Sequence, residues 1–195
     1  SLLLLAPLVW IFLRAGEIEF ARALELLTSD TTVSVTLNTL TLVTGVTTAS
    51  VLIGVPLAIL TAQTDLPFTR FWPITSALPL VVPSYIGAFA FVSAFGPQGA
   101  FQRLLTPLGV ERLPDIYGFT GAALVITLYT YPYVFITARA ALKSLDTTLI
   151  DAARTLDHGR WKAFRRVTVP QIRPAVTAGS LLVALYTLSD FGTPA

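Results

Sequence analysis

Four long apolar runs, at about residues 36–61, 73–95, 118–138 and 175–195, constrain this chain more than any other feature. Each run is long enough to cross the ~30 Å hydrocarbon core of a bilayer, which takes about 20 residues in an α-helix. Backbone polar groups in lipid need partners within their own segment, so a helix is the structure expected for each run. The sequence therefore predicts a multi-pass membrane protein.

A shorter apolar run covers residues 2–13 and would extend only about 18 Å as a helix. The core of a signal peptide is one interpretation, because such cores have about 7–15 residues. The following residues FLRAGEIEF offer no small-x-small cleavage site, which favours the truncated end of a span. We therefore expect an all-α bundle with about five spans in a single transmembrane domain over residues 1–195.

The composition agrees with a membrane protein and excludes several kinds of active site. Hydrophobic residues make up 54% of the chain and charged residues 12%, against roughly 25% charged in soluble domains. There is no cysteine, and His158 is the single histidine, so a thiol site and an H-E-x-x-H zinc site are both excluded. The Lys143-Ser144 pair follows Leu142 rather than glycine, so it is not a phosphate-binding loop. We expect no enzyme activity, catalytic residue, cofactor or metal site, and no nucleic-acid partner.

The distribution of charge predicts which connections face the cytoplasm. Residues 14–32 carry two basic and four acidic residues, residues 96–117 carry two of each, and residues 139–173 carry eight basic and three acidic residues. Lysine and arginine accumulate in cytoplasmic loops. We therefore expect residues 139–174 to form a cytoplasmic loop.

The basic stretch at residues 142–174 has the pattern of two short helices. The first has an apolar face and is expected to end at Gly159. That face consists of Leu145, Leu149, Ala153 and Leu156. In the second helix Trp161, Phe164 and Val167 lie on the inner side, and Pro170 and Pro174 are expected to end it.

The run DAARTLDHGRWKAFRRVTVPQIRPAV resembles the cytoplasmic signature loop of permease subunits in binding-protein-dependent ABC importers. Asp151 stands where that family usually has glutamate, and Gly159 matches its glycine. The resemblance implies a type I ABC importer permease fold, in which this loop docks on a cytoplasmic ATPase subunit. The residues expected to couple the two subunits are Asp151, Ala152, Ala153, Leu156, Gly159, Phe164 and Pro170.

Three further stretches, LPLVVPSYIGAF, TLYTYPYVFITARAALKSLD and LLVALYTLSDFGTPA, resemble the ferric-iron branch of these permeases. That branch has two homologous halves in one chain, and the present residues are similar to the first half. The resemblance implies a bacterial inner-membrane importer of ferric iron, with a dimer of ABC ATPase subunits, an extracytoplasmic binding protein and a second permease half as partners. Thiamine or an aminoalkylphosphonate are alternative substrates. An ion-driven secondary carrier is the alternative from another class.

Some polar residues within the spans are candidates for the transport pathway. Pro83, Ser84 and Tyr85 form either an irregular turn that lines the pathway or a packing kink. Asp190 either faces a water path or lies at the membrane interface. For two other sets of residues a structural role is the favoured interpretation. We expect one helix face to pack against another helix, namely the stripe Asn38, Thr41, Gly45 and Thr48. We expect three tyrosines to anchor the chain at the membrane interface, namely Tyr129, Tyr131 and Tyr133.

Overall fold

The computed structural model describes residues 9–10, 20–96, 99–108, 118–145, 162 and 164–189. Regular structure within these residues is entirely helical. The chain divides into two compact units, residues 1–41 and residues 42–195, and each is described by itself. The helices are α2 (Phe20–Thr28), α3 (Asp30–Gln63), α4 (Phe71–Ala77), the 3-10 helix η2 (Leu78–Val81), α5 (Ser84–Phe95), α6 (Ala100–Leu105), the 3-10 helix η3 (Thr106–Leu108), α7 (Phe119–Lys143), the π-helix η4 (Phe164–Thr168) and α10 (Val169–Ser189).

Three stretches of the described chain are long and apolar enough to cross a membrane. They are Asp30–Gln63, Phe119–Lys143 and Phe164–Ser189, with 34, 25 and 26 residues. A fourth crossing results if the bent pair Phe71–Val81 and Tyr85–Leu105 is one broken span. These stretches overlap the four long apolar runs, whereas the short run at residues 2–13 lies outside the described residues apart from Val9 and Trp10.

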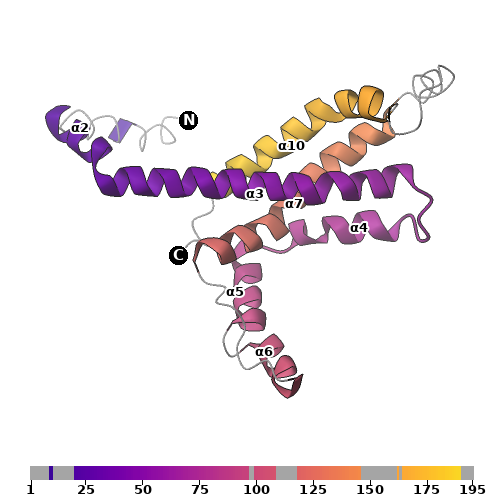
Figure 1. The fold of residues 1–195 in the computed structure, drawn as a ribbon, viewed down its shortest axis with the longest axis horizontal. Helices are drawn as coiled ribbons and strands as arrows, with labels where there is room; N and C mark the ends of the chain where they lie inside the picture. The colour runs from indigo at the N-terminus through magenta and orange to yellow at the C-terminus, as the bar shows by residue number, and fades with distance from the viewer. Residues whose placement is uncertain are drawn as a thin grey trace. The chain divides into compact units, whose positions relative to one another are not determined.

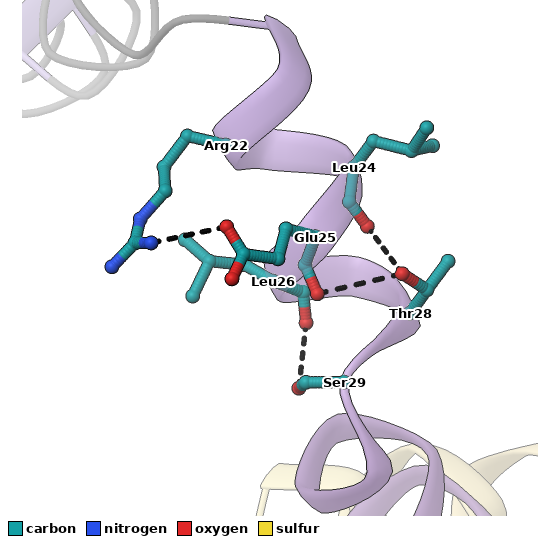
Figure 2. A network of polar contacts seen from close by, with 6 residues as sticks. All are labelled: Arg22, Leu24, Glu25, Leu26, Thr28 and Ser29. Carbon is teal, nitrogen blue, oxygen red and sulfur yellow. Dashed lines mark hydrogen bonds and ion pairs between the residues drawn. The ribbon is translucent and has the colours of Figure 1, made fainter.

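The first unit contains α2 and the beginning of α3, joined at Ser29. The backbone N–H of Thr32 lies 3.3 Å from Ser29 Oγ, so Ser29 caps the N-terminus of α3. Within α2, an ion pair joins Arg22 to Glu25, and the Thr28 hydroxyl donates to the carbonyl of Leu24 (Figure 2).

The packing face of α3 in the second unit differs from the face expected from the sequence. Gly45 and Thr48 are exposed, and no atom lies within 4 Å of a Cβ built on Gly45. Asn38 and Thr41, in the first unit, are also exposed. The expectation that this stripe packs against another helix is therefore wrong for the described residues. The buried residues of α3, all in the second unit, are Leu42, Val46, Ser50, Gly54 and Ala58.

Helix α7 is the central element of the second unit, and α3 and α10 both approach its backbone at Val134. A Cβ on Gly54 of α3 would lie 3.1 Å from Val134 Cβ, and a Cβ on Gly179 of α10 would lie 2.8 Å from Val134 Cα. The absence of a side chain at both glycines lets the helices approach this closely, as small residues do in membrane bundles. Figure 1 shows α10 running beside α7.

Two apolar clusters extend from this crossing along α7. Leu42, Val46, Ile126, Val134 and Val183 form one cluster. The second cluster lies toward the C-terminal end of α7 and consists of Ala58, Phe135, Ala138, Leu142 and Ile172. Both clusters join residues of α3, α7 and α10, so these three helices form one packed body within the second unit.

The apolar run at 73–95 is broken into separate helices. Pro79 lies in the 3-10 helix η2, and Pro83 precedes α5 with an extended backbone at φ −57° and ψ 135°. The segments on either side of this break are bent by 101° (Figure 1). Because proline lacks an N–H and restricts the preceding residue, an α-helix does not continue through this pair.

Candidate functional site

The segment between α7 and α10 contains the residues expected to contact an ATPase. Asp151, Ala152, Ala153, Leu156 and Gly159 lie outside the described residues. Phe164 and Pro170 are described: Phe164 begins η4 and is half-buried, and Pro170 is an exposed residue in the first turn of α10. The described structure thus gives the two ends of the segment.

Both ends of this segment pack on the same apolar cluster. Leu142 near the end of α7 is 5% exposed, and Leu145 packs against the cluster from the next turn. On the other side Thr168 and Ile172 are 2% and 3% exposed. Side chains before and after the segment therefore share one core.

The expectation that Pro170 and Pro174 end a short helix is wrong. The π-helix η4 leads directly into α10, which runs from Val169 to Ser189 and contains Pro174. Proline is tolerated in the first turn of a helix, where its missing N–H is least needed. Membrane helices also accept internal proline when neighbouring helices satisfy the freed groups. Accordingly α3 and α7 also contain internal prolines, at Pro56 and Pro132.

A π-helical turn at residues 164–168 is a second unusual feature of this junction. Such turns are rare and occur frequently at functional sites. Here the turn carries the exposed Arg165 and Arg166 and ends at the buried Thr168. Within this turn the chain passes from exposed basic side chains to the packed helix α10.

Arg139 links α7 to α3 close to this junction. Its Nε donates to the hydroxyl of Thr61 at 3.2 Å, and the hydroxyl of Thr61 lies 2.8 Å from the carbonyl oxygen of Leu57. Arg139 is half-buried, which is unusual for a charged side chain in a span and points to a functional or structural role. From the sequence, Arg139 was counted only among the loop charges. Its position directly after an apolar helical run is the signal that could have identified it.

A cleft of about 480 Å³ lies beside the helix break, between η2, α5 and α7. Pro83 and Tyr85 do not line it, and both are exposed. The side chain of Ser84 and the whole of Asp190 lie outside what is described. The pathway role expected for these residues therefore stays a prediction. The cleft is lined by Leu78, Pro79, Val82, Gly87, Ala90, Phe91, Ala94, Phe95, Val125, Leu128, Tyr129 and Tyr131.

Tyr129 fits closely against α5 at Gly87. A Cβ on Gly87 would lie 1.3 Å from the Tyr129 hydroxyl oxygen, so this contact requires glycine. Tyr129 and Tyr131 carry the hydroxyl groups of the cleft, whose other lining side chains are apolar. No group of three or more His, Cys, Asp or Glu residues occurs within the described residues. None of the residues that line the cleft is a His, Cys, Asp or Glu.

Comparison with known proteins places the chain in a family. A model described as "Binding-protein-dependent transport system inner membrane component" matches residues 50–194. The chain belongs to this family. It is a multi-pass membrane permease subunit and not an enzyme, as the sequence predicted.

Two curated members of this family show how far the similarity extends. The chain is 27% identical over 186 residues to the Fe(3+)-transport system permease protein FbpB 2 of Haemophilus influenzae, covering 95% of this chain and 33% of that protein. It is 30% identical over 188 residues to the molybdenum transport system permease protein ModB of Mycobacterium tuberculosis, covering 95% of this chain and 68% of that protein. The chain thus spans about a third of the first relative and about two thirds of the second.

A solved permease confirms the fold. The crystal structure of a bacterial ABC transporter involved in the import of the acidic polysaccharide alginate matches with a TM-score of 0.67 at 22% identity. The match covers 97% of this chain and 73% of that chain. The all-α fold of a type I importer permease, expected from the signature loop, is therefore shown.

Proposed function

We propose that this chain provides part of the membrane passage of an ABC importer for ferric iron. An extracytoplasmic binding protein delivers the iron, and a dimer of cytoplasmic ABC ATPase subunits supplies the energy. A second permease half completes the passage. The similarity to FbpB 2 and the ferric-type stretches in the sequence support this substrate. Family membership argues against the ion-driven carrier.

The single observation that carries the mechanism is the shared core at the two ends of the segment 146–163. Leu142 and Leu145 precede the segment, Ile172 follows it, and all three belong to one packed cluster. A cytoplasmic subunit that binds this segment acts on α7 and α10 together. ATP binding then favours one of two helix arrangements because the ATPase holds the segment differently in each state.

Molybdate is a second candidate substrate, supported by the similarity to ModB. Ferric iron is a cation and molybdate an oxyanion, so a passage that contacts the bare ion would need opposite charges for the two. The cleft beside α5 and α7 offers tyrosine hydroxyls and apolar walls, which favour neither. We infer that selectivity resides largely in the binding protein.

Variants of the coupling segment test the proposed function. Asp151→Arg and Gly159→Pro should uncouple ATP hydrolysis from uptake while the protein remains in the membrane. Asp151→Glu is the matched control, because it keeps the charge and introduces the residue that the resembled family usually has. Uptake per ATP should be retained in the control. Unchanged coupling in both test variants would reject the assignment of this segment.

Asp190 and the stretch Pro83–Tyr85 are further proposed parts of the pathway. Asp190 is proposed to face the passage, and Pro83–Tyr85 to form a wall of it once the second half is present. Asp190→Asn should lower the rate of uptake while leaving basal ATP hydrolysis unchanged. An equal loss of both activities would indicate a folding role instead.

A further inference from the structure

Helix α2 has an apolar face that no described residue of its own unit covers. Leu24 and Leu27 are 52% and 68% exposed, and they lie about 60° apart around the helix axis. Arg22 and Glu25 lie on the opposite side, where Arg22 Nη1 and Glu25 Oε2 form an ion pair at 3.0 Å (Figure 2). The helix is therefore amphipathic, with a neutral polar face.

Side-chain hydroxyls provide partners for some of the carbonyls at the junction between α2 and α3. The hydroxyl oxygens of Ser29 and Thr32 lie 2.9 and 2.8 Å from the carbonyl oxygen of Leu26, and the hydroxyl of Thr28 lies 2.8 Å from the carbonyl oxygen of Leu24. The last carbonyls of a helix lack partners within the helix and usually bind water. The hydroxyls of Ser29 and Thr32 give the carbonyl of Leu26 partners within the protein, which suits a helix end near lipid.

The apolar surface of α2 is continuous with that of a membrane span. Only Ser29 separates α2 from α3, whose first turns expose Val33, Leu37 and Leu40. Because α3 is long and apolar enough to cross the bilayer, α2 lies at the boundary where that crossing begins. Amphipathic helices at such boundaries bury their apolar side among the lipid chains.

We propose that α2 is an interfacial helix that binds the lipid bilayer. Leu24 and Leu27 insert among the acyl chains, and the Arg22–Glu25 pair faces the headgroups. Since this pair has no net charge, the association is hydrophobic and needs no anionic lipid. The helix fixes the depth and rotation of α3 in the membrane. This role is independent of which ion the importer carries.

Spin-label accessibility tests this proposal in the full-length permease. The present chain has no cysteine, so single cysteines are introduced into a cysteine-free background at Leu24, Leu27, Arg22 and Glu25. The labelled protein is reconstituted into vesicles of phosphatidylcholine and phosphatidylethanolamine. Collision rates with oxygen, which concentrates in lipid, are compared with those of a water-soluble nickel complex.

The labels at Leu24→Cys and Leu27→Cys should favour oxygen several-fold over nickel, and those at Arg22→Cys and Glu25→Cys should show the reverse. High salt should not change this pattern. Nickel access at all four positions would place α2 in water and overturn the proposal. Low access of both reagents at Leu24 and Leu27 would also overturn it, because a protein surface would then cover the face.

Discussion

The side-chain oxygens of Ser50 and Thr130 lie 3.1 Å apart at two positions without solvent exposure, and they join α3 to α7. The hydroxyl of Thr130 also donates to the carbonyl of Ile126 at 2.8 Å. A hydroxyl has one proton, so Ser50 is the donor to Thr130. This interhelical hydrogen bond lies in the core that unites the three long helices.

Removing this hydrogen bond should weaken the bundle by a small, measurable amount. Interhelical side-chain hydrogen bonds in membrane proteins contribute about 0.6 kcal/mol on average and up to about 1.7 kcal/mol. A double-mutant cycle with Ser50→Ala and Thr130→Val, measured as the free energy of unfolding in mixed micelles, should give a coupling energy in this range. Additive effects of the two substitutions would show that the hydroxyls do not interact.

The close approach of α10 to α7 should make Gly179→Ala destabilising. The added Cβ would lie 2.5 Å from Thr137 Oγ1 and 2.8 Å from Val134 Cα, so the helices must separate. Overpacking of this kind costs about 1–3 kcal/mol, which should appear as a lower melting temperature of the purified protein. Gly45→Ala is the matched control, because nothing lies within 4 Å of its added Cβ. Equal melting temperatures for the two variants would contradict the described packing.

A smaller side chain at position 129 should compensate for a larger one at position 87. Gly87→Ala places a methyl group on the tyrosine hydroxyl and should displace α5 from α7, lowering both stability and uptake. Tyr129→Ala removes that obstacle, so the double variant should be more stable than Gly87→Ala alone. Melting temperatures of the three variants test this. If the melting temperature of the double variant falls by the sum of the two single decreases, the two residues are not in direct contact.

Ile172 should be needed to couple substrate uptake to ATP hydrolysis. Ile172→Ala loosens the core that holds both ends of the segment 146–163, and such truncations cost about 2–5 kcal/mol in a packed site. ATP hydrolysis should continue while uptake per ATP falls. Ile136→Ala is the control on α7, since Ile136 is 44% exposed. The same uptake per ATP in both variants would show that this core is not needed for coupling.

The sequence predicted the helical spans because long apolar runs leave the backbone few alternatives in lipid. It did not predict which face of α3 packs. An apolar helix has no polar side to orient it, so Gly45 and Thr48 were as plausible as the true seam. The informative signal was the spacing of Ser50, Gly54 and Ala58, three small residues four apart.

The ends of the basic segment were harder to predict than the segment itself. Pro170 and Pro174 would end a helix in water, but α10 contains Pro174 and begins just before Pro170. The role of Leu142, Leu145 and Ile172 as a common core depends on contacts between residues distant in the sequence. The apolar pattern around Leu145 identified its inner face without identifying its partners.

Transport by the reconstituted system tests the central claim most directly. Vesicles containing the full-length permease are supplied with the ATPase, the binding protein and labelled ferric iron, with labelled molybdate in parallel and unlabelled thiamine and an aminoalkylphosphonate as competitors. The account predicts iron uptake that requires both ATP and the binding protein and that neither competitor reduces. Uptake that follows the membrane potential in vesicles without ATP would contradict it.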